Sequence, residues 1–317
     1  MVSAAERERA ATTVLAPGTT VTVEVPATSA NLGPGFDCFG LALSWRERVQ
    51  LTVTDGGYGV EVTGEGAAVV PRDETHLILS SALRGLAELG CAVPGLLLRC
   101  HNTIPHGRGL GSSSAAIVAG LLAAAGLAGR VREEDAALRR WLLQHAAAIE
   151  GHPDNVAAAV HGGFVLAWVG SAGLDAVSSP VHPDVAVTVF VPQTAVETRA
   201  ARGLLPATVP HGDAARNAGR SALLVHALQH DPDLLLDATA DWLHQDYRRS
   251  AMPASWDLVQ DLRAQGHAAV VSGAGPTVLV LGRRGAVAAV ADDPTGFRRL
   301  DLGVGAAAAV LPGAGTG

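Results

Sequence analysis

The first half of the chain alternates between stretches in which apolar residues have strand-like spacing and stretches in which they have helical spacing. Residues 19–25 (TTVTVEV) alternate between polar and apolar side chains, which predicts a half-buried β-strand that ends at Pro26. Residues 76–89 carry apolar side chains at helical spacing and stop at Gly90, which predicts a helix. The elements predicted for this half are strands at 19–25, 49–54, 60–63, 95–101 and 163–169, and helices at 76–89, 112–125 and 133–149, with a short helix after Pro153.

The second half is predicted to follow a linker at residues 170–183 (GSAGLDAVSSPVHP), which is rich in Gly, Ser and Pro. Because strands and helices are mixed in both halves, the pattern indicates the α+β class. We expect two domains, residues 19–175 and 176–302, between a flexible extension (1–18) and a loose Gly- and Ala-rich tail (303–317). The elements predicted here are strands at 185–191, 267–271 and 277–281, and helices at 195–204, 213–229, 232–245 and 255–265.

Composition and charge exclude several classes of protein. The net charge is −7 and the arginines are dispersed along the chain, which argues against a nucleic-acid partner and against an anionic membrane surface. The sequence contains no lysine, so that all 23 basic residues are arginine. A Walker P-loop, a protein kinase and a pyridoxal-phosphate enzyme each require a lysine, and none of them can be built here in the usual way.

The sequence predicts a reduced, cytoplasmic protein. Its three cysteines show neither a CxxC pair nor metal-ligand spacing. Residues 6–9 are charged where a signal peptide needs an apolar run. Residues 109–129 carry no charge, but their Ser, Ala and Gly content favours a buried helix over a membrane span.

A glycine-rich loop precedes the predicted helix at 112–125. Residues 105–115 (PHGRGLGSSSA) place Gly107, Gly109 and Gly111 at alternate positions, where the backbone can bend and turn its amides toward a ligand. The free amides and the helix dipole can bind phosphate groups without a lysine. The spacing is neither GxGxxG nor the Walker pattern, and a plain glycine turn capped by serine remains the alternative.

Three more segments carry candidate chemistry. Residues 26–37 (PATSANLGPGFD) offer Asn31 and Asp37 to a small polar substrate, or form only a tight Asx turn. In residues 150–155 (EGHPDN), the first carboxylate can hold Mg²⁺, and Asp154 either accepts a proton or caps a helix with its neighbour Asn155. Residues 272–277 (SGAGPT) by themselves indicate only a hairpin turn.

In their order and rough spacing, these four segments resemble the GHMP kinases, and the match covers about residues 20 to 281. The segments at 26–37 and 150–155 are similar to the homoserine kinase branch of that superfamily. Residues 198–206 (TRAARGLLP) and 244–248 (HQDYR) resemble two further segments of the same branch. The resemblance implies an N-terminal domain like domain 2 of ribosomal protein S5 and a ferredoxin-like C-terminal domain.

The resemblance also implies roles for individual residues. ATP would lie over the glycine-rich loop, with His76 where the family usually has an asparagine that touches adenine. Mg²⁺ would be held by Ser113 and Glu150. Asp154 and Arg202 would be catalytic, with Asp154 as an electrostatic or orienting group rather than a base. The implied ATP-binding residues are Pro105, Gly107, Arg108, Gly109, Leu110, Gly111, Ser112, Ser113, Ser114 and His76, and the implied residues for L-homoserine are Asn31, Asp37, Asn155, Thr198, Arg202, Arg248 and Gly275.

Two other functions remain open on the sequence alone. One is a GHMP kinase for another small alcohol; the discriminating pair is Arg202 and Arg248, which a sugar would not require and an amino-acid carboxylate would. A non-catalytic sensor of ATP on the same fold would have little need for Ser113 and Glu150. Family analogy predicts a homodimer. The spacing of His145, His152 and His161 fits no zinc pattern, so the sequence favours no metal site there.

Overall fold

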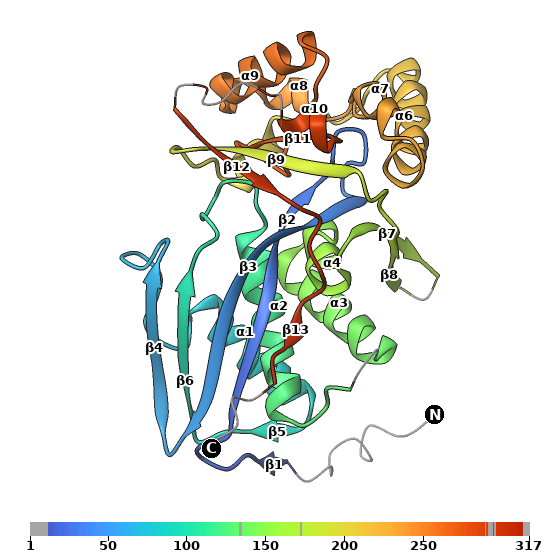
Figure 1. The fold of residues 1–317 in the computed structure, drawn as a ribbon. Coiled ribbons are helices and arrows are strands. Elements are labelled where there is room, and N and C mark those ends of the chain that lie inside the picture. Colours follow the sequence, from blue (N-terminus) through green and yellow to red (C-terminus); the bar gives the residue numbers. More distant parts are fainter. Residues whose placement is uncertain are drawn as a thin grey trace.

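The computed structural model describes residues 12–132, 135–171, 173–288, 290, 294 and 296–312. Within these residues the chain forms a seven-stranded sheet, a four-stranded sheet and a small pair of strands. Figure 1 shows the large sheet in the lower part of the molecule with helices packed on one face, and the small sheet above it beneath a second group of helices. The charged residues 6–9 lie outside the described part.

The large sheet is built around two long antiparallel strands, β2 and β3. Val21, Val23 and Val25 of β2 are buried, as the alternation predicts. Strand β3 begins ten residues earlier than predicted, because its apolar first half lies in the core between β2 and β7. The sheet has the order β13-β2-β3-β6-β4, with β7 paired to β3 and β8 paired to β7; the strands are β2 (Thr20–Ala30), β3 (Phe39–Thr54), β4 (Gly57–Gly64), β6 (Gly95–Asn102), β7 (Phe164–Gly170), β8 (Gly173–Ser179) and β13 (Ala309–Val310).

Helix α2 is the central element of the helical layer. Its residues are apolar on every side, and 12 of its 16 residues are buried, so it is a core helix enclosed by its neighbours. Gly120 allows α1 to approach, because a Cβ there would overlap the Ile78 carbonyl oxygen. None of the described helices is long and apolar enough to span a bilayer. The layer consists of α1 (Leu77–Glu88), α2 (Ser112–Leu127), α3 (Ala136–Glu150) and α4 (Asp154–His161).

The small sheet is fully antiparallel, in the order β10-β11-β9-β12. Its two central strands consist mostly of buried apolar residues. The sheet contains β9 (Val185–Pro192), β10 (Ala268–Val271), β11 (Val278–Arg283) and β12 (Phe297–Leu302). The helices around it are α5 (Thr198–Gly203), α6 (His211–Gln229), α7 (Leu235–Ala238), α8 (Gln245–Arg248), α9 (Pro253–Ala264) and α10 (Arg284–Ala288). At the other end of the molecule, β1 (Thr13–Val14) pairs with β5 (Cys91–Ala92) (Figure 1).

Two predictions in the middle of the chain were wrong. Residues 170–183 are mostly not a linker, because β8 pairs with β7 in a hairpin whose register runs from Gly170 to Phe164. The predicted helix at 232–245 is broken between α7 and α8. Asp241 accepts hydrogen bonds there from the amides of Leu243, His244 and Gln245, and so draws them into a new turn instead of a continuous helix.

The expected loose tail is also wrong for the residues that the structure describes. Beyond β12 the chain returns to the large sheet, where β13 pairs with β2 (Figure 1). The Gly305 amide donates to the Ala42 carbonyl oxygen at 2.8 Å, and a Cβ at residue 305 would overlap the Leu43 carbonyl oxygen. The low complexity of this segment therefore reflects close backbone contact. At the other end, the pairing of β1 with β5 shortens the predicted extension. The domain boundary at 175/176 stays a prediction.

Candidate active site

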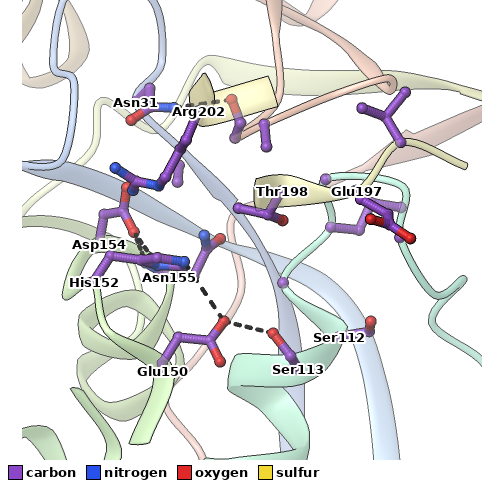
Figure 2. Close-up of a pocket in the computed structure, with 18 of the residues that line it drawn as sticks. Asn31, Ser112, Ser113, Glu150, His152, Asp154, Asn155, Glu197, Thr198 and Arg202 are labelled. Carbon is purple, nitrogen blue, oxygen red and sulfur yellow. Dashed lines mark hydrogen bonds and ion pairs between the residues drawn. The ribbon is translucent and has the colours of Figure 1, made fainter. Parts of the chain in front are cut away.

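A cavity of about 330 Å³ lies where loops of the large sheet meet the helices of the small sheet. Residues from every segment singled out in the sequence line it, from the end of β2 to the turn before β11 (Figure 2). Side chains separated by up to about two hundred positions therefore converge on one space. The polar side chains that line it are Asn31, Ser112, Ser113, Glu150, His152, Asp154, Asn155, Glu197, Thr198, Arg202 and Arg248.

The glycine-rich loop forms one wall through its backbone. Gly107, Gly109 and Gly111 have φ of 66°, 72° and 67°, a region that side chains disfavour. A Cβ on Gly109 would overlap the carbonyl oxygen of Ser272, and one on Gly111 would overlap the Thr28 hydroxyl. Gly111 is also the N-cap of α2, and the first amides of a helix have no partners within the helix. This wall can bind an anion with backbone amides alone.

Glu150, at the end of α3, faces the start of α2. The Ser113 hydroxyl donates to Glu150 Oε1 at 2.5 Å, and the Ser114 hydroxyl donates to the same oxygen at 3.0 Å (Figure 2 shows the first of these bonds). Ser114 is fully buried, so it orients the carboxylate and does not reach the cavity itself. The result is a carboxylate and a hydroxyl oxygen side by side next to the anion-binding wall.

The first turn of α4 contributes Asp154 and Asn155. Asp154 is buried, and its Oδ1 accepts the amide of Asn155 at 2.8 Å and lies 3.4 Å from His152 Nδ1. The nearby Asp154 carboxylate raises the pKa of His152, helped by the charge of Glu150. Thr28 donates to the side-chain oxygen of Asn155 at 2.9 Å, and the side-chain nitrogen of Asn155 has no hydrogen bond to the described residues, so it can donate to a ligand.

Two arginines face the cavity from the side of the small sheet. Arg202 forms a bidentate ion pair with Asp37 at 2.6 and 3.0 Å. Arg248 is 2% exposed, and burial together with nearby Arg202 lowers its pKa to about 10. Among the described residues no carboxylate oxygen lies within 4.0 Å of it, and its hydrogen bonds go to backbone carbonyls and a histidine ring. A buried guanidinium with no anionic partner is a natural binding group for an anion.

The loop after β2 holds the ring of Phe36 against both arginines. The ring centroid lies 5.5 Å from the Arg202 guanidinium carbon and 5.3 Å from that of Arg248. Asn31, which precedes the ring, and Asp37, which follows it, have positive φ of 68° and 55°, and Asn31 donates to the Gly273 carbonyl oxygen. Such strain in non-glycine residues persists only where the surroundings impose it, and it concentrates at functional sites.

Some candidate residues lie outside this cavity. Arg108 donates to the carbonyl oxygens of His106 and Gln193 and so stabilises the loop from behind. Gly275 packs against Met252 and the glycine-rich loop, while its neighbours Gly273 and Ala274 line the space. His76 lies in a second cavity that shares Gly107, Ser112 and Ser113 with the first. Pro105 and Ser114 line neither of the two cavities. Asp37 does not line the first cavity itself but pairs with Arg202, which does.

Sequence reasoning missed His152 and Glu197 as lining residues. His152 stands inside the EGHPDN segment, and Glu197 directly precedes Thr198, so their positions beside candidate residues were the available signal. In the second cavity it missed Glu47, for which the sequence offers only an acidic residue beside a predicted strand.

Comparison with known families agrees with this arrangement. Residues 76–163 match the model of the GHMP kinases N terminal domain, and residues 223–294 match that of the GHMP kinases C terminal domain. This chain belongs to the GHMP kinase family, and the predicted two-domain α+β fold of that family is confirmed. It is accordingly an ATP-dependent kinase.

Within the family, several relatives that share about half of its sequence are homoserine kinases. It is 54% identical to the homoserine kinase of Streptomyces coelicolor over 263 residues, which cover 82% of this chain and 84% of that protein. It is 50% identical to the homoserine kinase of Streptomyces avermitilis over 297 residues, or 92% of this chain and 96% of that protein. The crystal structure of homoserine kinase from Cytophaga hutchinsonii superposes with a TM-score of 0.78 at 28% identity, covering 92% of this chain and 98% of that one.

Proposed function

We propose that this chain transfers the γ-phosphoryl group of ATP to the side-chain hydroxyl of L-homoserine, giving O-phospho-L-homoserine and ADP, a step of threonine biosynthesis. The observation that carries the proposal is one cavity with a backbone anion site on one side and, on the other, a buried arginine that has no carboxylate partner among the described residues. The first suits a phosphate chain and the second suits the carboxylate of an amino acid. The homoserine kinases that share about half of its sequence support the same assignment.

The nucleotide side would bind phosphate through the amides of the glycine-rich loop and the first turn of α2. Ser113 and Glu150 fit a magnesium ion, because they present hard oxygen ligands within 2.5 Å of each other beside the phosphate wall. Magnesium bound there would neutralise charge on the phosphates and favour departure of ADP. In the described residues no group of three or more His, Cys, Asp and Glu side chains could form a metal cage, and an ion held largely by phosphate and water does not need one.

The acceptor side would bind the zwitterion of L-homoserine. Its carboxylate would pair with Arg248 and Arg202, and its ammonium group with Asp37, which already pairs with Arg202 at 2.6 Å. The ion pair therefore changes partners when substrate enters, so that neither charge is left alone. Asn155, with its side-chain amide donor, would hold the side-chain hydroxyl toward the phosphate, and Thr198 would help to bind the carboxylate.

The reaction then consists mainly of alignment and charge stabilisation. The substrate hydroxyl oxygen forms a bond to the γ-phosphorus, the bond from that phosphorus to the bridging oxygen breaks, and ADP leaves. The hydroxyl proton passes to a phosphoryl oxygen or to water. Asp154 lies buried at the start of α4, where its charge orients the neighbouring His152 and the hydroxyl rather than taking the proton.

An acceptor survey tests this proposal. Release of ADP from Mg²⁺-ATP would be measured with L-homoserine, mevalonate, galactose, shikimate and L-threonine. We expect turnover that depends on L-homoserine, with phosphate on the side-chain oxygen of the product. If ATP binds but no acceptor raises ADP release, the assignment falls. If another alcohol is preferred, the family stands and the substrate is wrong.

We also propose, by family analogy, that the enzyme acts in the cytoplasm as a homodimer. Size-exclusion chromatography with light scattering measures its mass directly. A mass near the 32.2 kDa of one chain would contradict the dimer.

A further inference from the structure

A second cavity, of about 300 Å³, opens beside the glycine-rich loop and shares Gly107, Ser112 and Ser113 with the active-site cavity. Its walls are mainly apolar, with Val70, Leu77 and Ile78 among them. An apolar slot continuous with a phosphate site suits a flat heterocycle that carries a phosphate chain. The inference below rests on the proposed function, since it takes ATP as the phosphoryl donor.

Glu47, on β3, places a carboxylate in this slot. The residue is 8% exposed, and its Oε2 accepts the amides of Thr103 at 3.0 Å and Ile104 at 3.3 Å. Oε1 has no hydrogen-bond partner among the described residues. It is also not among the fully buried atoms that lack a partner, so it keeps some exposed surface. Because Glu47 lines the cavity, this oxygen is open to it. Burial raises the pKa of this carboxyl, and the two amide bonds oppose that rise because they favour the carboxylate.

His76 presents the complementary group in the same slot. Its Nδ1 accepts the amide of Ile78 at 3.3 Å as the N-cap of α1, so the neutral ring carries its proton on Nε2. Burial lowers the pKa of His76, which favours that neutral form. His76 lines the cavity, and its Nε2 is not a fully buried unpartnered atom. The slot therefore presents an acceptor, Glu47 Oε1, and a donor, His76 Nε2–H, and the polar side chains of Asn102 and His106 also line it.

Adenine presents the opposite pair of groups. Its exocyclic amine is a donor and the adjacent ring nitrogen is an acceptor, whereas the corresponding edge of a 6-oxopurine presents an oxygen that would face the carboxylate. We propose that Glu47 determines nucleobase specificity by accepting a hydrogen bond from the adenine amino group, and that it rejects 6-oxopurines such as hypoxanthine and guanine. The carboxylate thus acts on the choice of nucleotide while its second oxygen secures the backbone at 103–104.

Glu47→Gln reverses the polarity of this group in a defined direction. Only an oxygen can accept both the Thr103 and Ile104 amides, so the glutamine oxygen takes the place of Oε2 and its NH₂ faces the cavity. The variant then offers a donor where the wild type offers an acceptor. It should lose affinity for an amino base and tolerate a 6-oxo base.

The experiment measures kcat/KM for ATP and ITP at saturating L-homoserine. We expect Glu47→Gln to shift the ATP-to-ITP ratio toward ITP by about tenfold or more, the usual size of a reversed base contact. Glu61→Gln, which makes the same chemical change on the exposed face of β4, is the control and should keep the wild-type ratio. A Glu47→Gln ratio within about twofold of wild type, in a variant with native circular dichroism, would overturn the proposal.

The wild-type enzyme provides a second test that needs no variant. ATP should exceed both ITP and purine riboside triphosphate, which lacks the amine, and equal use of all three would refute the role of Glu47. Absence of turnover with L-homoserine would instead refute the proposed function. In that case calorimetric binding of ADP and IDP to wild type and Glu47→Gln still decides the inference.

Discussion

The two sides of the proposed active site offer different physical means of recognising a ligand. The nucleotide side is one short stretch, residues 107–113, in which glycine backbone and the start of α2 line the cavity. The acceptor side is made of side chains brought together from distant segments, such as Asp37 and Arg202, which lie 165 positions apart. Backbone recognition depends on glycines and local dihedral angles, whereas side-chain recognition depends on how the two sheets dock.

The two sides also differ in backbone strain and in unpaired charge. On the nucleotide side the positive φ values fall on glycines, where they cost little. On the acceptor side they fall on Asn31 and Asp37, and the guanidinium of Arg248 is buried without a carboxylate partner among the described residues. We therefore expect the charge of Arg248 to be more costly before substrate binds than after a carboxylate pairs with it.

The strongest test of the comparison is the loss of charge at Glu150. Glu150→Gln keeps the shape of the side chain but removes the charge from the group paired with Ser113. We expect kcat to fall about 100- to 1000-fold, as when one preorganised group that stabilises the transition state is removed. The KM for L-homoserine should change less than about threefold, because this charge belongs to the nucleotide side. Steady-state kinetics check both values, with Glu61→Gln as control, and an unchanged kcat would remove Glu150 from the magnesium assignment.

The role of backbone geometry is tested by a pair of glycines. Gly109 and Gly129 have similar φ of 72° and 65°, but only at Gly109 would a Cβ meet other atoms. Gly129→Ala should cost about 1 kcal/mol of unfolding free energy through strain alone. Gly109→Ala should cost about 3 kcal/mol, because strain and overlap add.

Urea denaturation gives the unfolding free energies of both variants, and kinetics give the KM for ATP, which should rise only in Gly109→Ala. Equal effects of the two substitutions would show that the contact with Ser272 does not shape the loop.

On the acceptor side, Arg248→Ala should act mainly on substrate binding. We expect the KM for L-homoserine to rise about 10- to 100-fold with kcat within about threefold, since a charge-assisted hydrogen bond is lost. Arg249→Ala is the matched control, because the neighbouring arginine is exposed and pairs with Asp246 at 3.0 Å. Added guanidinium should partly restore the KM. A KM equal to that of wild type would contradict the assignment.

The smallest expected effect is a pH dependence that arises from the acceptor side. His244 is fully buried beside Arg248 and Asp241 and hydrogen-bonds the Gly33 carbonyl oxygen at 2.7 Å, and burial lowers its pKa. As the pH falls, His244 therefore becomes protonated in the unfolded chain before it does so in the folded chain. The contribution of the neutral His244 to the free energy of unfolding is complete above about pH 6.5 and is lost as the pH falls below that value.

Below pH 6.5, the free energy of unfolding should fall with decreasing pH, with a slope for one such group that approaches about 1.4 kcal/mol per pH unit. Urea denaturation between pH 7 and pH 5 measures it. His244→Gln keeps a donor for the Gly33 carbonyl oxygen and should reduce the slope. Identical slopes in the two proteins would show that another group titrates.

The sequence alone determined the local parts of this protein. Alternation predicted β2, the glycine spacing predicted an anion-binding loop at the start of α2, and the motifs indicated the family, because each of these depends on residues close together in the chain. The tertiary structure decided what depends on pairing between distant segments. It placed β8 and β13 in the large sheet where a linker and a loose tail were predicted, since strand pairing can override Gly-rich composition.

The same division holds within the site. The sequence indicated Ser113, Glu150 and Arg248 as candidates, but not that Ser114 orients the carboxylate of Glu150 or that Glu47 opens into the slot beside His76. Those contacts join residues from separate elements, and only the docking of helices and strands fixes which oxygen is satisfied and which is left open. The free oxygen of Glu47 results from two backbone amides at 103–104, and no local pattern in the sequence specifies that contact.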